Sequence, residues 1–467
     1  MAEIAATRAE TSAGDTAFAG ATSPLERMLV AFVRALDSER IPHCVLRGHR
    51  NFPRLAQGSD VDLLIQPADA RRVAAVVERC AREHGVSIWE RRRFGRMETF
   101  RCYAFAGPGR HEFFGLDVHT AETCFGVPFL AAGDVLARSR RVGELALPDA
   151  AQSACIDALG AFLSSGRVPP RHAGALRRAV AERPDEVERE LARWFGAAHA
   201  HRVVATVRRE PDFAPELPLA ALRRALLARA FARAPFASLG ALARFAWATR
   251  VEPWFAPHGR FVAFLGTDGT GKSTVIAGLT DELRRALGPE RVASFHLRPG
   301  CLPQLNALLH FGRTTYSLAD MDRPHRAKPS GRVVSTLRAA YYACDFVVGG
   351  WTRVRPWRRH SAVVVFDRYA YDYLVDPLRS RIRLDAPGLR AICGLCPRPQ
   401  RVLVCTAAAE TVRARKRELE EHETVRQLAA YEALARTLPN TTLVRTDGSV
   451  QDSVDAAVRA IFEERAP

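Results

Sequence analysis

Short apolar runs alternate with longer segments of helical periodicity in the carboxyl-terminal part of the chain. The runs cover residues 261–265, 292–297, 362–366, 401–405 and 442–444. In most of them the apolar residues follow one another directly, which is typical of strands that are buried on both faces. Helical segments between successive strands favour parallel pairing. This part of the chain therefore predicts an α/β fold in which a parallel sheet is covered by helices on both faces.

The amino-terminal part predicts a mixed α/β domain. Apolar residues three and four positions apart predict helices at 25–38 and 68–84. Short strands are expected at residues 43–46, 61–65, 87–90, 99–105 and 113–119. The alternation ends near residue 145.

The next hundred residues are rich in arginine, and several prolines interrupt their helical periodicity. One expected helix, 219–231, alternates leucine and alanine with Arg223, Arg224 and Arg229. A basic amphipathic helix of this kind has two readings. Either it lies on an anionic membrane surface, or its apolar side packs on a neighbouring domain while its arginines stay in water. The sequence leaves both readings open, and a peripheral membrane contact would fall within residues 219–250.

These patterns divide the chain into four segments. Residues 1–22 are rich in Ala, Thr, Ser and Gly and lack the basic start and apolar stretch of a signal peptide, so a disordered tail is expected. Residues 23–148 are the mixed α/β domain, and residues 149–257 are a helical, arginine-rich connecting region. Residues 258–467 are the parallel-sheet domain.

Composition narrows the classes of protein to which the chain can belong. It has 467 residues, of which 48% are hydrophobic and 25% are charged, which is typical of a globular protein with several domains. The net charge of +17 suits nucleic acid, anionic lipid, nucleotides or phosphorylated sugars as partners. The ten cysteines are scattered, and the only Cys-x-x-Cys, at 393–396, lacks the further ligands of a zinc site. With no apolar run near the ~18 residues of a membrane span, this usage predicts a cytoplasmic protein with buried thiols.

Candidate chemistry begins directly after the run 261–265. The spacing there is that of the phosphate-binding loop, G-x-x-x-x-G-K-[ST], at a strand-to-helix junction. Lys272, one of only three lysines among 68 basic residues, would reach the β- and γ-phosphates of ATP, and the Ser273 hydroxyl would sit on Mg²⁺. A helix expected at 273–287 adds the positive end of its dipole. The predicted cofactor-binding residues are Gly266, Asp268, Gly269, Thr270, Gly271, Lys272, Ser273 and Thr274. The alternative is a glycine-rich turn with an accidental lysine.

Two further features lie in the same part of the chain. Asp367-Arg368-Tyr369 ends the apolar run 362–366, and an acidic residue at that end of a strand is where a Mg²⁺-ordering carboxylate belongs. Residues 410–427 predict one helix with a cluster of cations, namely Arg413, Arg415, Lys416, Arg417 and Arg426. That helix is either a solvated surface helix or a mobile lid that closes over the transferring phosphoryl group.

These motifs resemble the thymidylate kinase family over residues 258–467. The resemblance rests on the loop 264–274, on Arg298-Pro299-Gly300, on Asp367-Arg368-Tyr369 and on the basic lid. It implies that Asp268 contacts the sugar of an acceptor nucleotide, and that Arg298 and Arg368 bind the acceptor's phosphate. The catalytic residues that it implies are Lys272, Asp367, Arg368, Arg413 and Arg417.

The sequence departs from that family in the parts that shape the acceptor pocket. The family's Arg-Glu-Pro-Gly loses its Glu here, and the segment 301–360 is long and includes Arg323, Arg326 and Lys328. Details around 295–299 and 367–372 are similar to thymidylate kinase-like proteins of bacterial surface-polysaccharide clusters. That similarity implies a cytoplasmic enzyme that supplies bacterial polysaccharide synthesis.

The amino-terminal domain holds a second candidate site. Gly58-Ser59-Asp60-Val61-Asp62 places two carboxylates on one side of a strand, and Asp117 supplies a third from another strand. Three such carboxylates can hold two Mg²⁺ ions. The pattern resembles the polymerase-β-type nucleotidyltransferases over residues 25–145. His49 stands where a second small residue would follow Gly48, so a degenerate or purely substrate-binding domain is the alternative.

Three functions remain open at this stage. The first is an ATP- and Mg²⁺-dependent kinase that acts on a nucleoside monophosphate or another small phosphorylated acceptor. Arg298, Arg368 and Arg413 favour an anionic acceptor, whereas a sugar hydroxyl would need Asp268 or Asp367 as a base. The second is a nucleic-acid end-processing enzyme, against which the chain lacks an aromatic, basic strand pattern for bases. The third is a non-catalytic nucleotide-binding protein. The sequence leaves the oligomeric state open.

Overall fold

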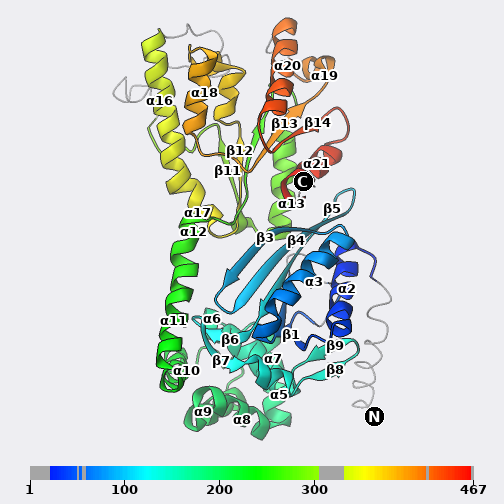
Figure 1. Cartoon of the computed structure of the whole chain (residues 1–467), viewed down its shortest axis with the longest axis vertical. Helices are drawn as coiled ribbons and strands as arrows, with labels where there is room; N and C mark the ends of the chain where they lie inside the picture. Colours follow the sequence, from blue (N-terminus) through cyan, green and yellow to red (C-terminus); the bar gives the residue numbers. More distant parts are fainter. Residues whose placement is uncertain (1–20, 50–51, 55–58, 304–330, 417–419, 464–467) are drawn as a thin grey trace. The chain divides into compact units, whose positions relative to one another are not determined.

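The computed structural model describes residues 21–49, 52–54, 59–303, 331–416 and 420–463 (Figure 1). The expected tail lies outside the described residues up to residue 20, and so do Arg417 and the cluster of Arg323, Arg326 and Lys328. The chain forms two compact units, and along the sequence the first gives way to the second between Glu252 and Pro253. Residues Gly107–His111 belong to the second unit. The division into four segments stays a prediction.

The second unit is built on a sheet of five parallel strands in the order β11-β12-β10-β13-β14. The strands are β10 (Phe261–Leu265), β11 (Val292–His296), β12 (Val363–Asp367), β13 (Arg401–Thr406) and β14 (Thr441–Arg445). Every residue of the central strand β10 is buried. The expected parallel sheet is therefore confirmed, because uninterrupted apolar strands need cover on both faces.

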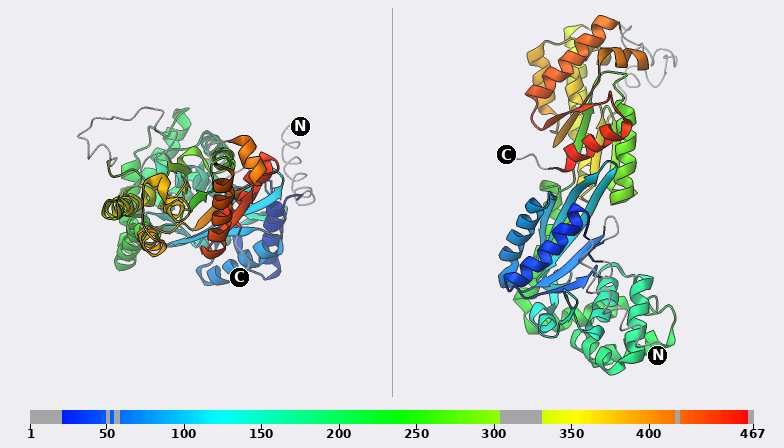
Figure 2. Two further views of the ribbon diagram at one scale, coloured as in Figure 1. Left: turned by 90° about the horizontal axis from the view of Figure 1, so that it is seen from above. Right: turned by 90° about the vertical axis from the view of Figure 1, so that its right-hand side faces the viewer.

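Helices cover both faces of this sheet. Helices α13 (Lys272–Leu287) and α21 (Val450–Phe462) pack together on one face and can be followed in Figure 2, in green and red. The other face packs against α16 (Arg332–Gly349), α18 (Ala386–Leu395) and α20 (Glu421–Thr437). Since successive strand residues point to opposite faces, the side chains of Phe261, Ala263 and Leu265 all join this second core. The described residues also form the short helices α12 (Glu252–Phe255), α17 (Arg355–Arg358) and α19 (Ala409–Arg415).

The first unit contains a mixed sheet in the order β1-β2-β5-β4-β3. Strands β2 and β5 are parallel, whereas β1 with β2 and β3 with β4 are antiparallel. Helices α2 (Pro24–Ser38) and α3 (Ala70–Glu83) share one core with it. The strands of this sheet are β1 (His43–Arg47), β2 (Asp60–Ile65), β3 (Ser87–Phe94), β4 (Met97–Gly107) and β5 (Arg110–His119). Two small two-stranded sheets are formed by β6 (Ala121–Cys124) with β7 (Val127–Ala131) and by β8 (Arg140–Val142) with β9 (Leu145–Leu147).

The helical segment of this unit shares a core with the same sheet. Cys44, Leu46 and Leu64 of β1 and β2 are buried in one cluster with the helices, while their neighbours Val45 and Leu63 belong to the core under α2 and α3. The helices are α4 (Ala132–Leu136), α5 (Ala150–Cys155), α6 (Ala161–Ser165), α7 (Pro170–Glu182), α8 (Pro184–Phe195), α9 (Ala197–Arg209), α10 (Leu219–Arg233) and α11 (Pro235–Ala246). Helix α10 buries Leu222 and Leu226, so its apolar side is occupied inside the unit.

The prediction of a single helix at residues 410–427 is wrong. Helix α19 ends at Arg415, Lys416 is extended at φ −152° and ψ 122°, and α20 begins at Glu421. The residues around this break are almost all charged. They offer no apolar stripe that could hold a continuous helix against the sheet, and packing of such a stripe supplies most helical stability in proteins.

Two further observations bear on the sequence predictions. Cys393 and Cys396 are buried as expected, and burial raises the pKa of each thiol to about 12, so neither is a reactive thiolate. Among the helices of the described ranges, none combines the length and the apolarity that crossing a membrane requires.

Truncating Phe366 is expected to destabilise the second unit. Its ring is fully buried, and its centroid lies 5.4 Å from that of Phe261, 5.0 Å from Phe295 and 5.5 Å from Tyr369. Phe366→Ala should lower the free energy of unfolding by about 3–5 kcal/mol, measured by urea denaturation. Val425→Ala, at a half-exposed position of α20, is the control and should change it little. Equal unfolding midpoints for the two variants would contradict the packing described.

Candidate phosphate-binding site

The loop between β10 and α13 has a backbone that requires its glycines. Gly266, Gly269 and Gly271 have φ angles of 142°, 89° and 75°. A Cβ atom added to Gly266 would lie 2.6 Å from the carbonyl oxygen of Cys405, and one on Gly269 would lie 2.9 Å from that of Val412. Both backbone angle and space therefore exclude larger residues here. The predicted loop residues are brought together as one turn at the carboxyl edge of the sheet.

Threonines hold this turn in place. The Thr270 hydroxyl donates to the carbonyl of Thr267 at 2.7 Å, inside the loop. From the end of β14, the Thr446 hydroxyl lies 2.7 Å from the carbonyl oxygen of Thr270. The loop is thus tied to a strand far away in sequence. Thr446 was not predicted, because a lone threonine at a strand end has no distinguishing pattern.

Lys272 and Asp367 face each other beside the loop. The Lys272 Nζ lies 3.4 Å from Asp367 Oδ1, and the lysine side chain is only 6% exposed. On the other side, His296 Nδ1 lies 3.2 Å from Asp367 Oδ2, because His296 and Asp367 are register partners in β11 and β12. Burial opposes ionisation of Asp367, but the hydrogen bond from His296 and the charge of Lys272 outweigh it and lower its pKa. The structure therefore brings Lys272 and Asp367 together, as the sequence predicts. The Oδ1 atom of Asp367 is buried and has no hydrogen bond.

Asp268 links two arginines. Its carboxylate accepts a hydrogen bond from Arg368, which follows β12, and another from Arg379, in the short 3₁₀ helix Pro377–Ser380. Burial opposes its ionisation, yet the charges of Arg368 and Arg379 hold the pKa of Asp268 well below its usual range. Arg379 was missed by sequence reasoning. Nothing in the local sequence shows that the chain returns to the loop at this position.

Arg368 has an uncommon backbone conformation for a residue other than glycine. Its φ is 72°, and its N–H donates to the carbonyl of Phe264 at 2.9 Å. A left-handed conformation at such a residue stores about 1–3 kcal/mol of strain and persists only when its surroundings impose it. Asp372 helps to impose it, because its carboxylate lies 3.5 Å from the guanidinium and also accepts from the Tyr431 hydroxyl at 2.5 Å.

Arg298 is held by a buried carboxylate on α16. Its guanidinium lies 3.4 Å from Asp345 Oδ2 and 4.2 Å from the ring centroid of Tyr342. The fully buried Asp345 also accepts backbone N–H groups of Gly300, Cys301 and Leu302, at 3.2, 2.7 and 2.8 Å. Asp345 therefore fixes the segment after β11. Sequence reasoning missed it, although a lone acidic residue in a largely apolar helix is a signal that was available.

The cations expected in the lid lie in different places. Arg413 pairs with Glu421 at 2.5 Å on an exposed surface. Arg415 donates to the carbonyl of Thr446 at 2.7 Å and lies 3.5 Å from where a Cβ on Gly271 would be. Of the described lid residues, Arg415 rather than Arg413 is therefore held against the phosphate loop. Arg417 lies outside the described residues.

The second candidate site, in the first unit, differs from the expected metal triad. Asp60, Asp62 and Asp117 do lie on the neighbouring strands β2 and β5, and Asp62 is the register partner of Asp117. However, Arg101 pairs with Asp60, and Arg47 donates to Asp62 at 2.6 Å. Within the ranges that the structure covers, no group of three or more His, Cys, Asp or Glu side chains could hold a metal ion.

In the structure these side chains form an ion-paired cluster, and the expected two-Mg²⁺ site stays a prediction. Burial opposes ionisation of Asp62, but hydrogen bonds and charge from His119 and Arg47 outweigh it and keep its pKa low. Asp117, by contrast, has its pKa raised, chiefly by burial. The spacing of the three aspartates could not reveal the arginines, because Arg47 and Arg101 come from other strands.

The comparisons with known proteins leave the family open. No family model matches this chain, and no curated protein matches it. Solved structures do match. One is a thymidylate kinase from Ehrlichia chaffeensis, at 13% sequence identity and a TM-score of 0.32, over 44% of this chain and 99% of that chain. A likeness of that size carries no argument about activity, so the site stands on its own geometry.

The paired charge of Asp268 makes a pH-dependent prediction. Its folded pKa lies below the unfolded value of about 3.9, so its stabilising contribution is present above that pH and is lost as the pH falls through the folded pKa. Asp268→Asn should therefore lower the melting temperature more at about pH 6.5 than at about pH 3.5. Differential scanning calorimetry measures both values. Asp212→Asn, at an exposed turn, is the control and should show no such difference. A variant that is as stable as the wild type at the higher pH would contradict the arrangement.

Proposed function

We propose that the second unit transfers a phosphoryl group from ATP to a small phosphorylated acceptor, of which a nucleoside monophosphate is the first candidate. The observation that carries this proposal is a phosphate-binding turn whose Lys272 lies 3.4 Å from Asp367 at the carboxyl edge of a parallel sheet. Ligands of open α/β sheets bind at that edge, where neighbouring strands connect in opposite directions. Strand β10, between β12 and β13, is such a point.

The residues present fit ATP and Mg²⁺. The glycine turn leads directly into the sixteen-residue helix α13, whose amino-terminal N–H groups and dipole favour phosphate oxygens. Gly269, Lys272, Ser273 and Thr274 would hold the phosphates. The buried Asp367 Oδ1, which has no hydrogen bond, and the Ser273 hydroxyl suit Mg²⁺ and its waters. When bound, ATP supplies the phosphoryl group and Mg²⁺ neutralises part of its charge.

The side chains of this unit supply charge and position. The Lys272 side chain is only 6% exposed. Its ammonium therefore neutralises charge near the transferring group with little rearrangement of water. Arg368 and Arg379 are held by Asp268, and Arg298 by Asp345, so their donors are fixed before an anion arrives. Arg415 adds a cation beside Gly271. Such preorganisation is the main protein contribution to phosphoryl transfer.

The state of Asp268 favours a phosphorylated acceptor over a sugar hydroxyl. A hydroxyl needs a general base, and a carboxylate with a pKa far below neutrality is an inefficient one. Both Asp268 and Asp367 have lowered pKa values, and each is paired with cations. A phosphate acceptor is already ionised and needs no base. The arginines around Asp268 then serve to bind it.

Replacing Lys272 should abolish turnover without unfolding the chain. Lys272→Ala removes the cation beside the transferring group and should lower the rate of ATP turnover by about 10²- to 10³-fold. The rate is measured with Mg²⁺ and a panel of nucleoside monophosphates and sugar phosphates. Arg436→Ala, an exposed cation near the end of α20, is the matched control. Undiminished turnover in the lysine variant would show that the loop is not catalytic.

The two candidate sites should be separable. Asp60→Asn with Asp62→Asn changes only the first unit, so phosphoryl transfer by the second should keep its kcat within about twofold, since sites in separate compact units that share no partners act independently. The same acceptor panel measures this, with circular dichroism to establish that the variant folds. A folded variant that has lost phosphoryl transfer would mean that the two units are functionally coupled.

A further inference from the structure

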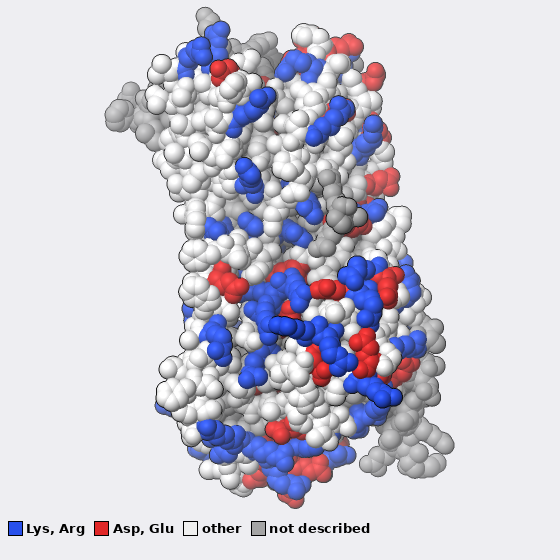
Figure 3. Space-filling view, viewed as in Figure 1, with Lys and Arg blue, Asp and Glu red and all other residues white. Residues whose placement is uncertain are grey.

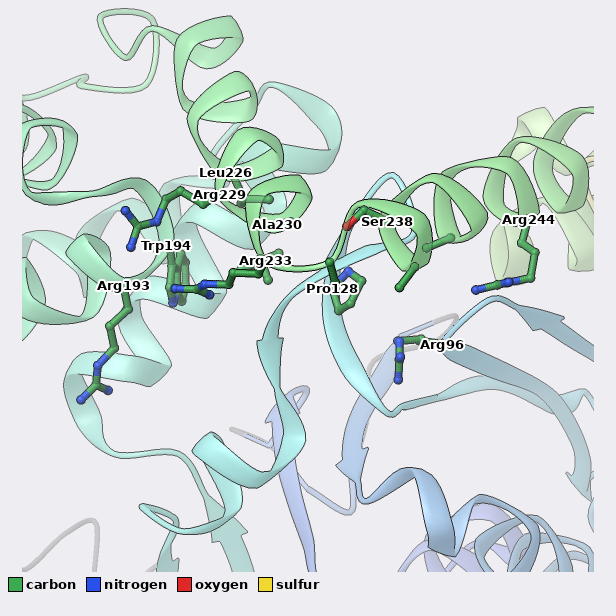
Figure 4. Close-up of a pocket in the computed structure, with 14 residues that line it drawn as sticks. Arg96, Pro128, Arg193, Trp194, Leu226, Arg229, Ala230, Arg233, Ser238 and Arg244 are labelled. Atoms are coloured by element: carbon green, nitrogen blue, oxygen red, sulfur yellow. The ribbon is translucent and has the colours of Figure 1, made fainter.

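A cavity of about 180 Å³ in the first unit is lined by arginines (Figure 4). Its walls come from helices α8, α10 and α11, from β7, and from the turn between β3 and β4. The arginines are Arg96, Arg193, Arg229, Arg233 and Arg244. At about 30 Å³ for each water, the volume equals about six water molecules, which is the scale of one or two phosphate groups.

The charge in this cavity is uncompensated by its lining. No aspartate or glutamate is among the lining residues. Arg193 pairs with Glu190 at 3.0 Å, but Glu190 also receives Arg138 at 2.7 Å. The Nε of Arg229 is buried without a hydrogen bond. Arg96, Arg193, Arg233 and Arg244 are exposed to solvent and Arg229 is partly buried. Like charges around one hollow favour the entry of an anion.

Several arginines elsewhere on the same unit are paired with acidic residues. Arg141 meets Asp37 at 2.6 Å, Arg91 meets Glu78 at 2.5 Å, and Arg34 meets Glu144 at 3.0 Å. Figure 3 shows basic and acidic side chains interleaved over the lower half of the face that it presents. A large arginine content therefore does not by itself produce an acid-free cavity.

A second hollow continues the first. Its volume is about 190 Å³, and it shares Arg96, Ala241 and Arg244 with the first while adding Arg93. Aromatic rings line one end of the first cavity, where the ring of Phe129 packs edge-on against the buried Trp194 at 5.1 Å between centroids. The two hollows together form a basic groove with an aromatic floor at one end.

We propose that this groove binds a small ligand that bears phosphate or diphosphate groups, at a site distinct from the phosphate loop. Guanidinium groups present paired N–H donors that match phosphate oxygens, and several of them around one hollow select a multiply charged anion. The aromatic floor accommodates an apolar or ring-shaped portion next to the anionic group.

The anion has two sources with the same chemistry, a free phosphorylated metabolite or a phospholipid headgroup. Helix α11 supports the second. The side chains of Phe236 and Leu239 on α11 are 90% and 59% exposed, and that of Trp247, at the start of the π-helix Trp247–Val251, is 59% exposed. Their spacing places all three on one helical face. Residues 217–251 contain no acidic residue. Arginines and exposed apolar side chains both suit the surface of an anionic membrane, and these three apolar side chains lie on the side of α11 away from the groove-lining Ala237, Ser238 and Ala241.

Calorimetric titration with inorganic pyrophosphate tests the site on the full chain with Lys272→Ala, which weakens the phosphate loop. Saturable binding is expected, and Arg233→Gln with Arg244→Gln, both exposed, should weaken it about tenfold or more. Arg229→Gln should do the same. The control, Arg202→Gln with Arg208→Gln on α9, removes the same charge outside the groove. Equal weakening in the control, or none in the groove variants, would overturn the proposal.

Vesicle flotation distinguishes the two sources. The full chain is mixed with phosphatidylcholine vesicles, with or without phosphatidylglycerol. Flotation that needs the anionic lipid, and that is lost in the groove variants and in Phe236→Ser with Trp247→Ser, identifies a lipid headgroup. Pyrophosphate binding without flotation identifies a free metabolite. If neither probe binds with the expected dependence on the groove arginines, the site does not exist.

Discussion

The carboxylate of Asp268 organises the edge of the sheet on which the candidate active site depends. It lies in the glycine turn, and it holds Arg368 and Arg379, which come from segments about a hundred residues farther along the chain. Without it, two guanidinium groups would face each other across a partly buried space. With it, the acceptor side of the site has fixed donors, and a strained Arg368 backbone is retained. Charge balance and geometry are therefore set by one side chain.

Much of the second unit could be predicted because its signals are local. An uninterrupted apolar strand followed by a fixed glycine spacing predicts both the strand and the turn after it, and residues 261–274 contain both signals. The contacts of Asp345, Arg379 and Arg415 could not be found in this way. Each acts through a partner that only the tertiary fold brings near, such as Thr446 for Arg415. The interrupted lid helix failed for a related reason, because helical charge spacing without an apolar stripe does not sustain a helix.

The first unit shows opposite treatments of buried charge. Around Asp60 and Asp62, arginines from other strands of the sheet pair with the carboxylates. In the groove beside Trp194, five arginines line the first cavity and its lining supplies no acid. Sequence spacing made the first site prominent, whereas for the second it indicated only a basic helix at residues 219–231 and not the groove. Charge carries functional information only once its partners, or the lack of them in a lining, are known.

The shared core of the first unit sets where this protein can be divided. Alternate residues of β1 and β2 face two different clusters, so the sheet is a middle layer rather than an outer one. A chain cut after residue 148 would leave Cys44, Leu46 and Leu64 in water, together with the apolar sides of β6 and β7. Such a fragment would be prone to aggregate. The arginine-rich helices are therefore part of one cooperative folding unit, and any recombination of this half with another protein must transfer sheet and helices together.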